Sequence, residues 1–175
     1  MLAIILAVSF GGFVVAGELE ASVDVSEPVP TGPPVPVAMG VSIRPVAGWE
    51  ETERYTQPDG VRLSRGVAHL DAYAFPAFGT PDEIFEDYRA NGLQPQASQL
   101  EVSTAQPILI GDGAQAIRVP YVGVFGDQAA AIEGEVTAAV TADGVAILFD
   151  GWAPQGELGF SVAEIRAMVE GVDGG

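Results

Sequence analysis

Acid–base chemistry would require a pair of groups such as His69 and Asp71, which stand two residues apart in an alternating stretch. If residues 67–75 form a strand, both side chains lie on one face, because side chains alternate along a strand. A carboxylate beside an imidazole can orient a general base. No serine, Ser64 included, has the flanking glycines of a nucleophile elbow. We therefore expect a structural or surface role for His69, name no catalytic residue and predict that the chain is not an enzyme.

A run of acidic residues could supply hard oxygen ligands to Ca²⁺. The run comprises Asp82, Glu83, Glu86 and Asp87. No D-x-D-x-D-G loop accompanies it, and Glu83 stands three residues after Thr80, where it would complete a helix capping box. We expect a solvated helix face at these residues and predict neither a metal nor a cofactor.

Aromatic residues offer the remaining chemistry, which is ligand binding. Trp49 and Trp152 could form an exposed platform, although a tryptophan that follows glycine in a turn is more often a partly buried plug. Tyr121, Phe125 and Trp152 fall at the ends of predicted strands, where a pocket between a sheet and a helix could open. We therefore take Trp49, Tyr121, Phe125 and Trp152 as the candidate ligand-binding residues, for a small apolar ligand.

The residue types that are missing exclude several classes of function. The 175 residues include no Cys and no Lys, so disulfides, thiol nucleophiles, zinc–cysteine sites, a lipid-bearing cysteine and lysine Schiff bases are ruled out. With 24 acidic residues against 7 Arg, the formal net charge is −17. Nucleic acid binding requires a basic patch, so we predict no nucleic acid partner.

The chain begins with an uncharged apolar segment, residues 2–17. As a helix it would be about 24 Å long, which is marginal against a hydrocarbon core of roughly 30 Å. A signal peptide and a buried core element are the alternatives, but a signal peptide and a membrane anchor both call for a basic flank. The first positive charge is Arg44, so we expect a basic stretch upstream of Met1. We predict that residues 1–17 are a membrane anchor or an uncleaved signal.

The next segment, residues 18–39, is acidic and then rich in proline. Its sequence EPVPTGPPVPV, residues 27–37, favours an extended polyproline II spacer. Anchor, spacer and domain in this order would hold a globular domain away from a membrane. We predict a single-pass protein of the cell membrane with an extracytoplasmic domain, or a secreted one if the first segment is cleaved.

The remaining segment, residues 40–173, predicts an α+β domain built on a mostly antiparallel sheet. Thr80, Pro81 and Glu83 predict a helix start, Gly92 predicts its end, and Ser161 with Glu164 predicts a second capping box. The apolar stretch 145–152 should be a central strand, whereas 132–141 should keep one face exposed to water. The other predicted strands are 39–44, 51–57, 61–65, 67–75, 99–105, 107–110 and 114–124.

The opening GVSIRPVAGWE of this domain, residues 40–50, is similar to the start of PsbP-like domains. A helix with Phe85 and Tyr88, a long hairpin and a closing amphipathic helix follow in a similar order. The domain also resembles membrane-anchored or lipidated cell-envelope proteins of actinobacteria, of the LpqN kind, although it lacks their lipid-bearing cysteine. The resemblance implies an α/β/α sandwich and a non-catalytic role.

Two functions follow as expectations. The first is a membrane-tethered, extracytoplasmic accessory module that binds an unknown protein or component of the cell envelope. The alternative is a carrier of a lipid or small apolar ligand in a cavity between the sheet and the helices. A continuous apolar cavity of several hundred cubic ångströms would favour the carrier, and a flat apolar patch with a polar rim would favour the accessory module.

Overall fold

A computed structural model describes residues 27–126 and 130–174 of the chain. The predicted N-terminal anchor, residues 1–17, lies outside the described residues, as does the first part of the predicted linker. Among the described residues, no helix has both the length and the apolarity that crossing a membrane requires.

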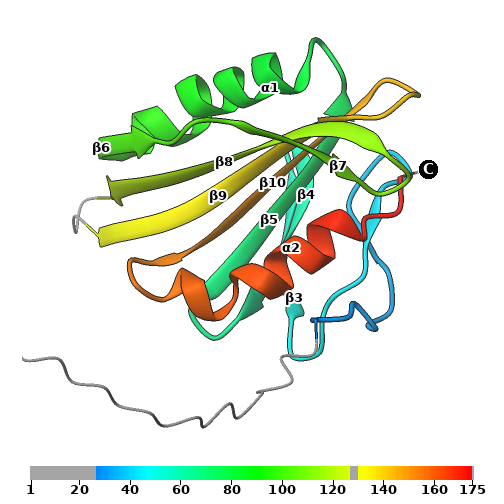
Figure 1. Ribbon diagram of the computed structural model, residues 1–175, viewed down its shortest axis with the longest axis horizontal. Coiled ribbons are helices and arrows are strands. Elements are labelled where there is room, and N and C mark those ends of the chain that lie inside the picture. Colours follow the sequence, from blue (N-terminus) through cyan, green and yellow to red (C-terminus); the bar gives the residue numbers. More distant parts are fainter. Residues whose placement is uncertain (1–26, 127–129, 175) are drawn as a thin grey trace, which may run out of the picture.

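The fold is organised around one antiparallel sheet of eight strands (Figure 1). The strand order is β3-β4-β5-β10-β9-β8, and β6 and β7 both pair with the outer edge of β8. The strands of this sheet are β3 (Glu50–Thr56), β4 (Asp59–Arg65), β5 (Ala68–Pro76), β6 (Ala97–Val102), β7 (Gln106–Ile110), β8 (Ala114–Phe125), β9 (Ala130–Val140) and β10 (Val145–Pro154). The predicted mostly antiparallel sheet is confirmed, and the apolar strand β10 is central, between β5 and β9.

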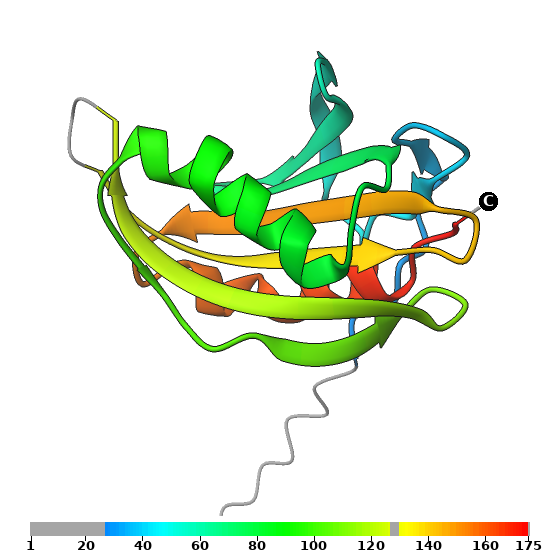
Figure 2. The same cartoon turned by 90° about the horizontal axis from the view of Figure 1, so that it is seen from above.

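Two helices cover opposite faces of the sheet (Figure 2). Helix α1 (Pro81–Tyr88) packs on β8, β9 and β10, and helix α2 (Val162–Glu170) packs on β7 and β10 from the other side. Short helical turns flank them: η1 (Arg89–Leu93), η2 (Gln94–Gln96) and η3 (Leu158–Phe160). The arrangement is the α/β/α sandwich that the resemblance to PsbP-like domains implied.

Alternation along the central strands divides the core in two. One set of side chains from β5 and β10 meets α2, and it includes Leu70, Ala72, Ile147 and Phe149 against Ile165 and Met168. The opposite set meets α1, and it includes Ala146 and Leu148 with Val136 and Ala138 of β9 against Ile84 and Phe85. Burial of apolar surface on both faces is what fixes the two helices to the sheet.

The hairpin between β3 and β4 turns at Gln57 and Pro58, because Thr56 pairs with Asp59. Asp59 and Gly60 therefore belong to β4, whereas the predicted strands 51–57 and 61–65 left residues 58–60 for the turn. Gly60 is required there by close packing, since a Cβ at this position would lie 2.6 Å from the ring of Tyr73 and 2.5 Å from a backbone oxygen. The glycine therefore lets the ring of Tyr73 lie directly on the hairpin.

The ends of the two helices differ in part from expectation. The capping box at Thr80 and Glu83 is confirmed. Gly92 does not end α1; it lies inside the turn η1, where a Cβ would contact the ring of Tyr88 at 2.8 Å. The predicted capping box at Ser161 is wrong, because the carboxylate of Glu164 instead accepts a hydrogen bond from Trp49 and pairs with Arg65.

Strand β9 also departs from the sequence pattern. The predicted wet face is covered, since Glu135 and Thr137 are buried beneath α2. Arg118 and Arg166 pair with the carboxylate of Glu135 at 3.1 and 2.5 Å, so an ion-pair network replaces water at this face. The sequence pattern therefore wrongly predicted that the buried carboxylate of Glu135 lies on the surface.

The folded part begins before residue 40. Strand β1 (Val35–Pro36) pairs with β2 (Ser42–Ile43), and Val37 is buried. The backbone of Ser42 also exchanges two hydrogen bonds with that of Asp173, so the C-terminus lies beside this small sheet (Figure 1). The last residues of the predicted linker are thus part of the domain.

Candidate functional site

A cleft opens on the α1 side of the sheet, between the β3–β4 hairpin and the α1–η1 segment. Its volume is about 410 Å³. Strands β5 and β10 contribute to its lining, and the side chains that line it are largely aromatic or aliphatic. We call it the aromatic cleft; it is lined by Tyr55, Gln57, Pro58, Tyr73, Phe75, Phe78, Ile84, Asp87, Tyr88, Asn91, Gly92 and Leu148.

Alternation on β5 brings the aromatic side chains to this face. Tyr73 and Phe75 share it with His69 and Asp71, because all four stand at every second position of one strand. Tyr55 of β3 stacks on Tyr73 with ring centroids 5.4 Å apart, and Phe78 stacks on Phe75 at 6.0 Å. Two stacked aromatic pairs therefore line one cleft.

Beside the cleft, Asp71 is the centre of a buried polar network. Its carboxylate accepts a two-pronged pair of hydrogen bonds from Arg62, at 2.6 and 2.9 Å. The hydroxyl of Tyr55 donates to it at 3.0 Å and the indole of Trp152 at 3.1 Å. Four hydrogen bonds therefore occupy the two oxygens of Asp71 as acceptors.

Asp150 stands directly opposite Asp71 on the neighbouring strand β10. Its partners are hydroxyls: Tyr88 donates at 2.7 Å and Tyr121 at 2.9 Å. Burial raises the pKa of Asp150 to about 7, and the charge of Asp71 acts in the same direction, while the two tyrosine hydrogen bonds oppose the shift. Asp150 is thus a carboxyl that can hold a proton near neutral pH.

The tyrosines that bind these carboxylates are held as hydrogen-bond donors. Burial first, and then the charge of Asp150, raises the pKa of Tyr88 and of Tyr121 far above the ordinary range. Burial and the charge of Asp71 do the same to the pKa of Tyr55. Protonated hydroxyls anchored on buried carboxylates fix the positions of these rings.

His69 shares a face of β5 with Asp71, as predicted, but the two side chains do not form the pair that acid–base chemistry would require. Its Nδ1 lies 2.8 Å from the hydroxyl of Ser64, and its ring packs on Trp152 with centroids 4.2 Å apart. Burial, followed by the charge of Arg62, lowers the pKa of His69. Because Asp71 binds Arg62 and Trp152 instead, the geometry contains no carboxylate that orients this imidazole among the described contacts.

The four predicted ligand-binding residues fall in two places. Trp49 is buried on the α2 side, where its indole donates to Glu164 at 2.8 Å. Tyr121 and Phe125 meet edge to face at 6.1 Å on the α1 side, and Trp152 joins the Asp71 network there. None of the four is among the described residues that line the aromatic cleft.

The residues that do line the cleft left a partial signal in the sequence. Alternation already placed Tyr73 and Phe75 on the face of His69 and Asp71, and helical spacing already placed Tyr88 on the apolar side of α1. Phe78 carried no such signal, because it lies in the loop between β5 and α1. Bringing Tyr55 against Tyr73 required the pairing of three strands.

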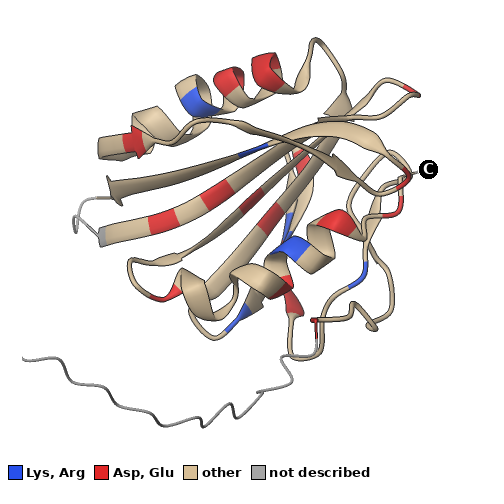
Figure 3. Cartoon of the chain, in the orientation of Figure 1, with Lys and Arg blue, Asp and Glu red and all other residues tan. Residues whose placement is uncertain are grey.

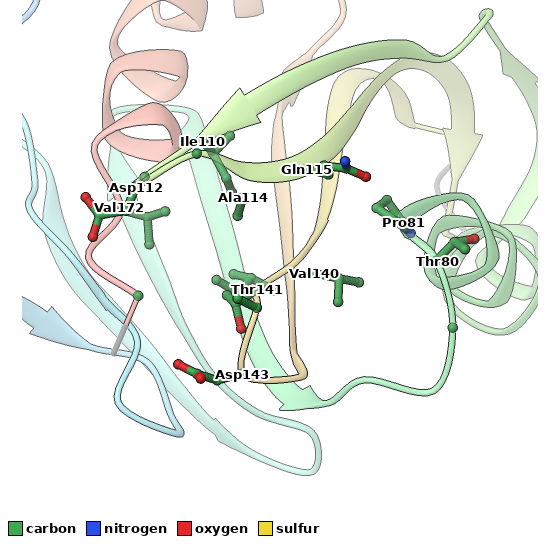
Figure 4. A pocket seen from close by; sticks show the side chains of 16 residues that line it. Thr80, Pro81, Ile110, Asp112, Ala114, Gln115, Val140, Thr141, Asp143 and Val172 are labelled. Carbon is green, nitrogen blue, oxygen red and sulfur yellow. The ribbon is translucent and has the colours of Figure 1, made fainter.

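A second cleft, of about 610 Å³, lies at the end of the sheet where the β7–β8 and β9–β10 turns meet the start of α1 (Figure 4). Small and aliphatic side chains such as Ala114, Val140 and Val172 line it, with Asp112 and Asp143 on its turns. The described residues of its lining include no aromatic side chain. It therefore lacks the large rigid surfaces that hold ligands most strongly.

Comparison with solved structures identifies proteins whose fold is similar to that of this chain. A cyanobacterial PsbP from Synechocystis sp. PCC 6803 superposes with a TM-score of 0.56 at 14% identity, over 77% of this chain and 86% of that one. The fold is PsbP-like. A Bacteroides thetaiotaomicron protein follows, with a TM-score of 0.53 at 14% identity over 82% of this chain, although the match spans only 48% of that protein.

The PsbP-like architecture is also shared by the Ran-binding protein Mog1p of Saccharomyces cerevisiae, with a TM-score of 0.50 at 11% identity over 82% of this chain and 96% of that one. No family model and no curated protein sequence matches this chain. Identities this low establish the fold alone, so the function must be argued from the cleft.

Proposed function

We propose that the chain is a non-catalytic binding module that holds a small, largely apolar ligand in the aromatic cleft. The observation that carries the proposal is the lining of that cleft, where two stacked aromatic pairs line about 410 Å³. Ligand sites are concave, mostly apolar and furnished with a few polar groups, and this cleft has that composition. Of the two expected functions, the cavity favours the ligand carrier.

Exposure of Phe78 supports the proposal. Its side chain is 61% exposed although its ring stacks on Phe75. Burying apolar surface is favourable by roughly 25 cal/mol per Å², so a ligand that covers this ring would gain from a surface already held in place. The fixed tyrosines of the cleft lower the conformational entropy lost on binding.

The non-catalytic part of the proposal rests on how the titratable groups are used. Asp71 is saturated by Arg62, Tyr55 and Trp152, and His69 is turned to Ser64. A general base needs a free acceptor within hydrogen-bond reach of a substrate proton. These groups serve as scaffold, which fits a protein that binds without reacting.

We place this module on the outer side of a membrane. The support is the sequence: an apolar segment at residues 2–17, an acidic and proline-rich linker, and the resemblance to anchored actinobacterial cell-envelope proteins of the LpqN kind. Without a cysteine, attachment would depend on the apolar segment. The ligand would then be a component of the cell envelope.

The proposal is tested by calorimetric titration of the full chain with 2-naphthol, a neutral aromatic probe small enough for the cleft. Phe78→Ala removes an exposed ring from the cleft, and Phe160→Ala removes a ring that is 80% exposed next to α2. We expect saturable binding that Phe78→Ala weakens about tenfold and Phe160→Ala leaves unchanged. Equal affinities of the two variants, or no binding, would contradict the proposal.

A further inference from the structure

We propose that the ligand of the aromatic cleft is an organic cation that carries a quaternary ammonium group, of the size of choline. The inference rests on the proposed function, since it names the ligand class of the same cleft. It is carried by the combination of aromatic faces, negative charge and few accessible hydrogen-bond acceptors.

The aromatic content of the cleft is what a quaternary ammonium needs. Such a cation has no N–H group to donate, so proteins bind it by packing its methyl groups against electron-rich ring faces. The described lining holds five aromatic side chains, namely Tyr55, Tyr73, Phe75, Phe78 and Tyr88. Each contact of this kind contributes roughly 0.5–2 kcal/mol, and several together select a cation over its neutral isostere.

Hydrogen bonding to carboxylates strengthens these rings as cation binders. Tyr55 donates its hydroxyl to Asp71, and Tyr88 donates to Asp150. A hydroxyl that donates to a carboxylate is polarised, and its ring becomes richer in electrons, in the way that linked hydrogen bonds polarise one another. The network therefore makes these two rings better partners for a cation and fixes their orientation.

The charge around the cleft is negative, which is the sign that a cationic ligand requires. The lining includes the carboxylate of Asp87, of which one oxygen accepts a hydrogen bond from Asn91, and it includes no basic side chain among the described residues. The guanidinium of Arg62 lies over the ring of Tyr55, 5.7 Å from its centroid, so this ring already meets one cation. Asp71 and Glu53 both pair with Arg62. The sum of these three groups is one negative charge.

The rest of the molecule does not compensate for this negative charge. Each of the seven arginines pairs with at least one carboxylate, in the contacts of Arg44, Arg54, Arg62, Arg65, Arg89, Arg118 and Arg166. Helix α1, whose residues help to line the cleft, carries further acidic residues (Figure 3), among them Asp82 and Glu83 of its first turn. A cation is therefore attracted to this side of the domain.

The acceptors of the cleft decide between quaternary and primary ammonium groups. A primary ammonium brings three N–H donors that require acceptors once they leave water. Tyr55 and Tyr88 already donate to buried carboxylates, and the other polar lining side chains are Gln57, Tyr73, Asp87 and Asn91. A trimethylammonium group needs only the ring faces, so the cleft fits it better.

The test compares choline with 3,3-dimethyl-1-butanol, which has the same shape but carries carbon in place of the charged nitrogen. Calorimetric titrations of the full chain should give an affinity for choline about tenfold or more above that for the alcohol. Asp87→Asn should weaken choline several-fold and leave the alcohol unchanged. Asp82→Asn, on the same helix but outside the cleft lining, should weaken choline much less than Asp87→Asn does and should also leave the alcohol unchanged.

The outcomes separate this inference from the proposed function. If 2-naphthol binds at the cleft but choline binds no better than the alcohol, the cation class is wrong and the proposed function stands. If choline, the alcohol and 2-naphthol all fail to bind, both proposals fail. A preference for choline that Asp82→Asn reduces as much as Asp87→Asn would place the selectivity outside the cleft and overturn the inference.

Discussion

Asp71 and Asp150 face each other across strands β5 and β10, and they are held in opposite ways. Asp71 is bound by the guanidinium of Arg62, whereas Asp150 is bound by the hydroxyls of Tyr88 and Tyr121. Two adjacent buried carboxylates repel each other when both are charged. The arrangement resolves this repulsion by giving a cation to one carboxylate and two hydroxyl donors to the other.

This difference predicts a pH dependence of stability at Asp150. Its pKa is about 7 in the folded state against an ordinary value of 3.8, so the folded protein binds the proton more tightly than the unfolded chain. The stabilisation from this proton is complete below pH 4 and is lost as the pH rises to about 7. The difference between the two pKa values corresponds to about 4 kcal/mol in the free energy of unfolding. Relative to Asp150→Asn, wild type should therefore lose stability over this range. Parallel pH profiles of the two proteins in urea unfolding would contradict the assignment.

The Asp71 network predicts a large effect of a small substitution. Asp71→Asn leaves the guanidinium of Arg62 with only the more exposed carboxylate of Glu53, and we expect it to lower the free energy of unfolding by about 3 kcal/mol. The exposed pair of Arg44 and Asp173 provides the control, since Asp173→Asn should cost less than about 1 kcal/mol. Urea denaturation compares them, and equal small effects would show that the buried network does not stabilise the fold.

Close packing at Gly134 predicts that a larger residue there disturbs the hydrogen bond between Tyr121 and Asp150. A Cβ at this position would lie 2.5 Å from the hydroxyl oxygen of Tyr121, which binds Asp150. Gly134→Ala should displace this ring and destabilise the protein by about 1–3 kcal/mol. Gly159 has open space around it, so Gly159→Ala should be neutral or slightly stabilising in the same thermal unfolding experiment.

The packing of His69 predicts that its imidazole has a lower pKa than a free histidine. Burial, followed by the charge of Arg62, lowers the pKa of this imidazole, so the folded protein favours its neutral form. An NMR titration of its ring protons should give a midpoint below the ordinary value of about 6.5. A midpoint above that value would mean that Asp71, and not Ser64, is the partner that governs His69.

Much of this fold could be predicted because local signals and packing agree. The alternation of β5, the capping box at Thr80 and the apolar run of β10 each act within a few residues, and all three are confirmed. The exposed face predicted for β9 failed because the partners of Glu135 come from Arg118 of β8 and Arg166 of α2. Long-range ion pairs leave no local pattern.

The cleft illustrates the same limit. Alternation predicts which face Tyr73 and Phe75 occupy, but not that Tyr55 and Tyr88 approach them from two different elements. Three of the predicted ligand-binding residues, Tyr121, Phe125 and Trp152, lie on the α1 side of the sheet but outside the cleft lining. The fourth, Trp49, lies on the α2 side. A binding role for these four residues stays a prediction.

The most direct test of the binding claim is an NMR titration of the isotope-labelled full chain with 2-naphthol, following every backbone amide. We expect shifts that saturate together at Tyr73, Asn91 and Gly92 in the aromatic cleft. Shifts gathered instead around Gly113 and Thr141 would place the ligand in the second cleft at the sheet end and contradict the account, as would no saturable shift at all.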